Sequence, residues 1–292
     1  MGILVDERTK VLVSGITGRQ GSFHAQQMLE FGTRLVAGVT PGRGGQEVAG
    51  IPVYDTIEAA VDKHGATAAV LFVPGALARD AALEAMDAGL SPVVVIAEHV
   101  PLQDAIDLVA FAAARAAVLI GPNTYGICTP GGRVKLGIPP GRIFQPGPVG
   151  VVARSGTLSY EIVAALSEAG LGQSTVVGIG GDRVVGLGFV EALKRFAKDE
   201  DTRAVVLVGE IGGTAEEEAA EFIKGMAKPV VAYLAGASAP RGKRMGHAGA
   251  IIERGRGSFA SKRQALEAAG VAVAALPWDV APLVAAALGG EG

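Results

Sequence analysis

Short aliphatic runs alternate with longer amphipathic stretches along almost the whole chain, and this alternation restricts the fold more than any other feature. The runs predict strands at 11–14, 35–39, 69–73, 93–96, 117–120, 149–152, 174–179, 204–208 and 230–234. The stretches predict helices at 21–31, 57–63, 76–88, 101–115, 157–169, 187–196 and 214–226, before a last helical unit at 258–270, a short strand and a C-terminal helix. Apolar runs separated by helix-length segments are typical of parallel sheets covered by helices on both faces. We therefore expect an α/β fold with doubly wound sheets.

A stretch rich in glycine and proline, residues 126–147, interrupts this alternation. Such a cluster is typical of a loop or linker. We therefore expect a first domain at 1–125, a linker at 126–147 and a second domain at 148–292. A chain of 292 residues with 49% hydrophobic residues is long and apolar enough for two cores of ordinary size.

Composition and charge exclude several classes of function. The net charge of −3 gives no general attraction to nucleic acid. We find no apolar run long enough to cross a bilayer and no signal peptide at the start, and we expect a cytoplasmic protein without a membrane partner. The one cysteine, Cys128, has no cysteine or histidine nearby at ligand spacing, so we expect neither a disulfide nor a metal site.

The glycine-rich segment GITGRQG, residues 15–21, joins the first predicted strand to the first predicted helix. Backbone amides at such a turn can bind a phosphate, although the glycines can also serve only the packing of the helix. The spacing is not the G-x-G-x-x-G of dinucleotide sites, and the second strand is followed by Arg43 without an acid for a ribose hydroxyl. These features disfavour NAD and favour a ligand with an additional phosphate.

A second strand-to-helix turn, ARSGTLSY at 153–160, offers small hydroxyl groups and free amides at Ser155, Gly156 and Thr157. This pattern is typical of an anion site and equally of ordinary helix capping. Glu210 follows the predicted strand at 204–208, where ligands of open α/β sheets bind. It can orient a nearby histidine, or it is simply a solvated loop residue.

One histidine has surroundings suited to chemistry. His247 lies in RGKRMGHAGAI, between glycines and next to cations that would attract a phosphate, although an isolated loop histidine is usually structural. We interpret His24, His64 and His99 as helix-surface or loop residues. Thr214 and Glu217 have the spacing of a capping box, and we interpret the acidic run at 216–218 as a favourable first helical turn.

Taken in order, these motifs resemble those of succinate–CoA ligase α subunits. The matching segments are GITGRQG, GVTPGRGG, IGPN, ARSGTLSYE, VGIGGD, GEIGG and GKRMGHAGAI. The resemblance implies an N-terminal Rossmann-like CoA-binding domain followed by a flavodoxin-like ligase domain, paired with an ATP-grasp β subunit in an αβ or α2β2 assembly. It also implies that CoA and a small dicarboxylate are substrates, and that the β subunit holds ATP or GTP and Mg²⁺.

The same resemblance assigns roles to individual residues. His247 corresponds to the phosphorylated histidine, and Glu210 to the acid that supports its ring. The positions that correspond to CoA-binding residues are Thr17, Gly18, Arg19, Gln20, Arg43, Ile96, Ala97 and Glu98. Ser155, Gly156 and Thr157 correspond to the phosphate-binding helix start, and Tyr160, Asn123 and Thr124 lie at the expected acid-substrate site.

The chain departs from the family pattern at a few of these positions. Thr124 and Tyr125 replace the usual cysteine and proline, and their hydroxyl groups suggest a hydroxylated diacid, as in the similar malate–CoA ligase small subunits. Arg43 and Arg183 replace a lysine and a proline. We therefore expect a succinate–CoA ligase α subunit, with a malate–CoA ligase as the alternative; an NAD-dependent oxidoreductase and a non-catalytic CoA-binding protein are more distant alternatives.

Overall fold

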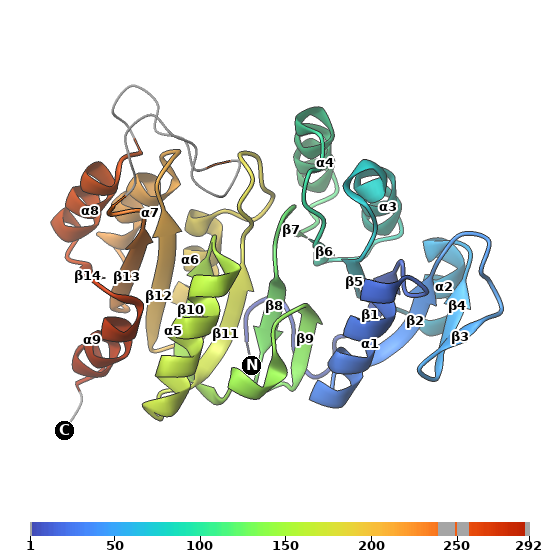
Figure 1. The fold of residues 1–292 in the computed structure, drawn as a ribbon, viewed down its shortest axis with the longest axis horizontal. Helices are drawn as coiled ribbons and strands as arrows, with labels where there is room; N and C mark the ends of the chain where they lie inside the picture. The colour runs from blue at the N-terminus through green and yellow to red at the C-terminus, as the bar shows by residue number, and fades with distance from the viewer. Residues whose placement is uncertain (1, 239–248, 250–256, 290–292) are drawn as a thin grey trace.

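The chain forms two sheets that lie side by side with helices around them (Figure 1). This arrangement comes from a computed structural model, which describes residues 2–238, 249 and 257–289. Within these residues each sheet has seven strands, most of them parallel. The predicted α/β class is therefore confirmed.

The first sheet has the strand order β3-β4-β2-β1-β5-β6-β7. Its strands are β1 (Val11–Ser14), β2 (Leu35–Val39), β3 (Glu47–Val48), β4 (Ile51–Tyr54), β5 (Ala68–Leu71), β6 (Val93–Val95) and β7 (Leu119–Ile120). All neighbours are parallel except β3 and β4, a short hairpin that the sequence did not predict. The chain builds outward in one direction from β1 and in the other from β5, so ligands are expected at the carboxyl ends between these two strands.

The second sheet has the order β14-β13-β12-β10-β11-β8-β9. Its strands are β8 (Gly126–Thr129), β9 (Val134–Gly137), β10 (Pro146–Ala153), β11 (Gln173–Gly178), β12 (Ala204–Glu210), β13 (Val230–Ala235) and β14 (Ala272–Ala274). The strands β10 to β14 are parallel, and β8 and β9 are added at one edge as an antiparallel hairpin. From β10 the chain first adds β11 on one side and then β12, β13 and β14 on the other, so the direction in which strands are added changes between β10 and β12.

Helices cover both faces of both sheets. They are α1 (Arg19–Phe31), α2 (Ile57–His64), α3 (Gly75–Asp87), α4 (Leu102–Ala114), α5 (Gly156–Glu168), α6 (Phe189–Lys198), α7 (Ala215–Ile223), α8 (Phe259–Ala268) and α9 (Val280–Ala287), with 3₁₀ turns η1 (Gly141–Ile143) and η2 (Pro277–Asp279). In the first sheet α1 packs on one face and α2 to α4 on the other. In the second sheet α6, α7 and α8 pack on one face, and α5 and α9 pack on the other. None of the helices in the described part of the chain is long and apolar enough to cross a membrane.

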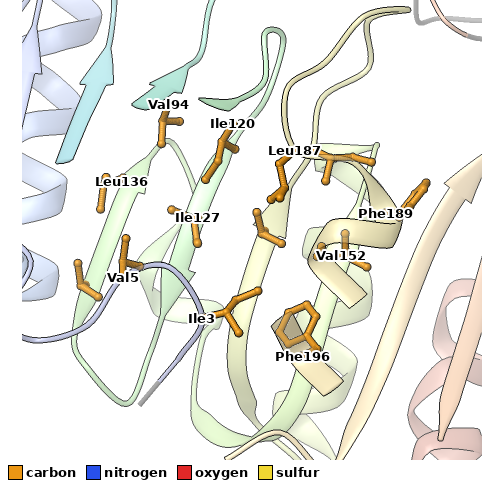
Figure 2. Packing of buried hydrophobic residues seen from close by; sticks show 14 of the residues in the cluster. Ile3, Val5, Val94, Ile120, Ile127, Leu136, Val152, Leu187, Phe189 and Phe196 are labelled. Carbon is orange, nitrogen blue, oxygen red and sulfur yellow. The ribbon is translucent and has the colours of Figure 1, made fainter. Parts of the chain in front are cut away.

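The β8–β9 hairpin joins the two halves. It is hydrogen-bonded into the second sheet and packs against α1 of the first half. Its buried Ile127 and Leu136 belong to one continuous apolar core with Val94 and Ile120 of the first sheet and Val152 of the second (Figure 2). Thr33 Oγ1, at the end of α1, donates to the Lys135 carbonyl at 3.1 Å and accepts from its amide at 3.0 Å. The segment 126–147, which we predict to be a linker, therefore contains strands that position the two sheets.

A fully buried ion pair fixes the loop that follows β12. Lys262 of α8 and Glu216 of α7 are both 0% exposed and form a charged hydrogen bond. Lys262 Nζ also donates to the carbonyls of Glu210, at 2.8 Å, and Gly212, at 2.6 Å. Glu216 Oε1 accepts from the Glu210 amide at 3.1 Å. Glu216 is thus part of a buried network, and the interpretation of the acidic run as only a favourable first turn is wrong for this residue.

Helix α7 begins where the sequence predicts, but it lacks the predicted capping hydrogen bond of Thr214. Thr214 is the N-cap residue as predicted, yet its side chain makes no capping hydrogen bond. Its Oγ1 donates instead to Glu218 Oε1 at 2.8 Å. Glu217, the acid of the predicted capping box, instead accepts a hydrogen bond from Ser261 Oγ on α8.

We expect Lys262→Met to lower the free energy of unfolding by about 3–5 kcal/mol, because it removes one partner of a buried ion pair and leaves Glu216 charged in the interior. The neighbouring Arg263 forms a half-exposed pair with Glu267 and provides a matched control. Arg263→Met is expected to change stability by less than about 1 kcal/mol. Urea unfolding followed by circular dichroism measures both, and equal effects of the two substitutions would contradict this account.

Candidate functional site

A cavity of about 650 Å³ lies between the two sheets and is bordered by loops from both. Its walls contain Gln20, His24, Phe72, Ile96, Ala97, Glu98, Asn123, Thr124, Tyr125, Ile138, Arg154, Ser155, Gly156, Thr157 and Tyr160. Most of these residues follow the carboxyl ends of strands or begin the next helix. The cavity is therefore located where open α/β sheets bind ligands.

The turn between β1 and α1 forms part of the first wall. A Cβ at Gly21 would lie 2.1 Å from the Gly15 carbonyl oxygen, so these two glycines allow α1 to approach the strand end closely. Thr17 Oγ1 donates to Thr40 Oγ1 at 3.1 Å, which links the turn to the end of β2. Gly18 is the N-cap and provides no side chain, which leaves the first amides of α1 without partners inside the helix.

The predicted CoA-binding residues divide into two groups. Gln20 and the segment 96–98 line the cavity. Thr17 and Gly18 lie in the adjoining turn, Arg19 begins α1, and Arg43 is an exposed residue in the loop after β2. A ligand that touches all of them would extend from the cavity across the carboxyl edge of the first sheet.

The start of α5 forms the opposite wall. Ser155 is its N-cap residue, but its side chain makes no capping hydrogen bond. The first amides of α5 therefore have no partner from the cap, and the positive end of the helix dipole is directed at the cavity. The sequence left helix capping open as an alternative role for Ser155, but its hydroxyl does not cap α5.

Arg154 is a site residue that the sequence reasoning missed. It is 8% exposed, lines the cavity, and places its Nε 3.4 Å from Glu210 Oε1 across the change of direction between β10 and β12. Its Nη2 donates to the Asp182 carbonyl at 3.3 Å. In the sequence Arg154 resembles any exposed cation next to a turn. Its position directly after a predicted buried strand, opposite Glu210, was the signal that could have identified it as a site residue.

Gly249 is in contact with this arginine. Its amide donates to the Gly181 carbonyl at 3.1 Å, and a Cβ at Gly249 would lie 2.3 Å from Arg154 Nη2. His247 itself lies outside the described residues. The contact of Gly249 nevertheless places the chain two residues after His247 beside the Arg154–Glu210 ion pair.

The residues after β7 are held by the second half of the molecule. Asn123 Nδ2 donates to Asp182 Oδ1 at 3.0 Å. Thr124 is 5% exposed; its Oγ1 donates to the Gly178 carbonyl at 2.6 Å and accepts from the Gly126 amide at 3.0 Å. The single proton of the Thr124 hydroxyl is therefore committed to the backbone and is not available to a substrate.

Two tyrosines pack edge to face beneath the start of α5. The rings of Tyr125 and Tyr160 have centroids 5.6 Å apart at an interplanar angle of 64°. Burial raises the pKa of both phenols, so both stay protonated at neutral pH. Both residues line the cavity, and both hydroxyls are buried without a hydrogen-bond partner among the described residues.

The described histidines differ from one another. His64 forms a 2.7 Å hydrogen bond with the Tyr54 hydroxyl, and the His99 side chain is 92% exposed, as expected for residues outside a site. His24 lines the cavity, so its interpretation as a surface residue is wrong. The sequence could not reveal this because the face of α1 that carries His24 is covered partly by segments distant along the chain, including Phe72.

The surroundings of Cys128 and of possible metal ligands bear on thiol and metal chemistry. Cys128 is fully buried, and burial raises the pKa of its thiol, which disfavours the reactive thiolate. Within residues 2–238, 249 and 257–289, no three histidine, cysteine, aspartate or glutamate side chains gather as they would around a metal ion.

Comparisons with known proteins agree with this geometry. A CoA binding domain family matches residues 6–99, and a CoA-ligase family matches residues 152–272. An ATP citrate lyase from Methanothrix soehngenii, solved with citrate and coenzyme A, superimposes with a TM-score of 0.89 at 27% identity; the match covers 98% of this chain and 50% of that longer chain.

Relatives of similar length are closer in sequence. Succinate–CoA ligase [ADP-forming] subunit alpha 2 of Archaeoglobus fulgidus is 58% identical over 285 residues, which is 98% of this chain and 99% of the relative. The corresponding alpha subunit of Methanothermobacter thermautotrophicus is 56% identical over 98% of this chain and 97% of its own length. With two matching domain families in the same order, the chain belongs to the family of succinate–CoA ligase α subunits.

Proposed function

We propose that this chain is the α subunit of an NDP-forming acid–CoA ligase. The enzyme converts succinate, CoA and ATP or GTP reversibly to succinyl-CoA, ADP or GDP, and phosphate. The names of its relatives support succinate as the acid and ADP as the product nucleotide. The observation that carries the proposal is a single cavity shared by Gln20 and Glu98 of the first half and the start of α5 in the second.

CoA occupies the first wall in this proposal. Its binding residues are Thr17, Gly18, Arg19, Gln20, Arg43, Ile96, Ala97 and Glu98, all of which fall inside the matched CoA binding domain. The uncapped amides of α1 suit a phosphate group, and Arg43 on the adjoining loop provides a cation. The reactive end of the molecule then enters the cavity.

The second wall binds the migrating phosphate and the acid. The amides of Ser155, Gly156 and Thr157 face the phosphate, supported by the buried charge of Arg154. Asn123, Thr124 and Tyr160 border the space left for the succinate carboxylates. Tyr160 borders the same space, and its phenol, which stays protonated, can donate to one carboxylate.

His247 carries the phosphoryl group between the acid and the nucleotide. Neutral imidazole is a nucleophile near pH 7 and forms a phosphorylated intermediate. Glu210 orients the imidazole ring, and Arg154 holds Glu210 while stabilising the charge of the phosphoryl group. The contact of Gly249 with Arg154 supports this placement.

The geometry at Thr124 favours succinate over malate. We expected the hydroxyls of Thr124 and Tyr125 to favour a hydroxylated diacid. The Thr124 hydroxyl donates its proton to the Gly178 carbonyl and cannot donate it to a substrate hydroxyl at the same time. Tyr125 is 4% exposed, and its hydroxyl is buried without a hydrogen-bond partner among the described residues, so of the two replaced positions only Thr124 has its proton committed to the backbone.

The chain works with a second subunit. We propose an ATP-grasp β subunit that holds the nucleotide and Mg²⁺, in an αβ or α2β2 complex located in the cytoplasm. We keep the division into a CoA-binding domain at 1–125, a connecting segment at 126–147 and a ligase domain at 148–292. The matched families at 6–99 and 152–272 support this division, with the β8–β9 hairpin between them.

The complex with the β subunit should accept an acid-labile phosphate from radiolabelled ATP and Mg²⁺, and His247→Asn should abolish this label because it removes the nucleophile. His64→Asn, which changes a histidine outside the cavity, should be labelled like the wild type. Succinate with CoA should discharge the label, and malate with CoA should do so far more slowly. Labelling of His247→Asn, or equal discharge by malate, would contradict the proposal.

Arg154→Met should reduce the rate of phosphoenzyme formation by about 100-fold, the usual effect of removing one charge-stabilising donor from an active site. It should also destabilise the fold, because the buried Glu210 loses its ion pair with Arg154. The double variant Arg154→Met/Glu210→Gln should regain much of that stability, yet be labelled far more slowly than Glu210→Gln alone. Rapid-quench labelling and urea unfolding separate the two effects; a double variant labelled as fast as Glu210→Gln would show that Arg154 is only structural.

A further inference from the structure

His24 lies at the point where the first sheet changes direction. It belongs to α1, which follows β1, and its ring stacks on Phe72, which follows β5, with centroids 5.3 Å apart and an interplanar angle of 8°. Phe23 packs edge-on against the same imidazole at 5.0 Å. The ring therefore sits in a defined place on the cavity wall, between the CoA-binding loops and the start of α5.

One nitrogen of this ring is buried. Nδ1 of His24 is buried, and no hydrogen-bond partner for it lies among the described residues. A buried polar atom without a partner costs free energy, and such atoms in folded proteins usually have a function or bind a molecule. An apolar ring would stack on Phe72 without this cost, so packing alone does not explain an imidazole here. Because Nδ1 is buried, Nε2 is the ring nitrogen that a molecule in the cavity can reach.

The surroundings keep His24 uncharged. Burial, and then the positive charge of Lys135 on β9, lower the pKa of the imidazole below its ordinary value. The other charged side chains on the cavity wall are Glu98, after β6, and Arg154, after β10. A neutral imidazole at pH 7 has an unshared electron pair and can accept a proton.

We propose that His24 is the general base for the thiol of CoA, an inference that rests on the proposed function. The thiol proton passes to the unprotonated imidazole nitrogen as the sulfur attacks the carbonyl carbon of succinyl phosphate. The C–S bond forms, the C–O bond to phosphate breaks, and phosphate leaves with the electron pair of that bond. In the reverse direction the imidazolium returns the proton to the departing thiolate.

The other described groups on the cavity wall suit this role less well. Arg154 cannot accept a proton, and burial keeps Tyr160 protonated. The Glu98 side chain is 68% exposed, and a carboxylate in water is a weak base toward a thiol. Among the described residues, His24 is the histidine that lines the cavity.

Two substitutions separate proton transfer from packing. His24→Phe keeps an aromatic ring against Phe72 but cannot accept a proton, and His24→Gln keeps a polar side chain but cannot act as a base near pH 7. His64→Gln is the matched control, because His64 is also a helix residue but lies outside the cavity and contacts Tyr54. The complex with the β subunit is phosphorylated by ATP, separated from nucleotide, and mixed with succinate and CoA in a single turnover.

We expect both His24 variants to form the thioester about 100-fold more slowly than the wild type, a usual contribution of a general base. Formation of the phosphoenzyme should be unchanged because it involves no thiol, and this step also reports correct folding and assembly. Trapping succinyl phosphate as the hydroxamate with hydroxylamine should proceed at the wild-type rate, because this neutral nucleophile does not need its proton removed beforehand. His64→Gln should match the wild type in all three measurements.

The pH dependence provides a readout that a packing role would not move. In the variants the rate of thioester formation should rise about tenfold for each pH unit below the thiol pKa, because the reaction then depends on free thiolate. The wild-type rate should stay nearly constant from pH 8 downward and fall only below the ordinary histidine pKa of about 6.5, where His24 becomes protonated.

Three results would be decisive against His24 as the base. The first is thioester formation at the wild-type rate in His24→Phe. The second is an equal loss of thioester and hydroxamate formation in both variants. The third is a pH profile of thioester formation in the variants that matches the wild type. If one variant fails to assemble, the other carries the comparison. Failure of the wild-type complex to form phosphoenzyme or hydroxamate would instead overturn the proposed function, so the two proposals fail in distinguishable ways.

Discussion

The β8–β9 hairpin is the element on which the site depends. It extends the second sheet by antiparallel hydrogen bonds and packs its apolar side chains against α1 and the core of the first half. The two sheets are thereby held side by side (Figure 1), and loops that follow strands of both border one shared cavity. Each sheet alone would provide half of a ligand site; the hairpin makes the halves face each other.

The two walls of the cavity divide the chemistry between them. The first sheet contributes the loops proposed for CoA and the neutral imidazole of His24. The second contributes the uncapped start of α5 and the buried guanidinium of Arg154, which are suited to an anion. In the proposed reaction, the thiol that must lose a proton would meet an uncharged imidazole, and the phosphate would meet a cation and a helix start.

The sequence predicted the α/β elements well because each buried strand is a local apolar run and each helix a local periodic pattern. It predicted the loops around Gln20, Ser155 and Glu210 because glycine and small hydroxyl residues at strand ends have a recognisable local chemistry. It missed the hairpin at 126–137 because the glycines and prolines of this stretch indicated a linker, and because β11, the strand of the second sheet that pairs with β8, lies far along the chain. For the same reason it missed His24, Arg154 and the buried Glu216–Lys262 pair, whose environments arise from tertiary contacts.

We infer that the thiol of CoA attacks succinyl phosphate, and phosphate leaves, in the cavity between the two sheets. A crystal structure of the complex with its β subunit, bound to CoA and phosphate, would locate the two atoms that decide this. We predict that the CoA sulfur lies within hydrogen-bond distance of the His24 ring and that the phosphorus lies in front of the amides of Ser155 to Thr157. A CoA sulfur outside the cavity, or a phosphate bound away from the start of α5, would contradict the account.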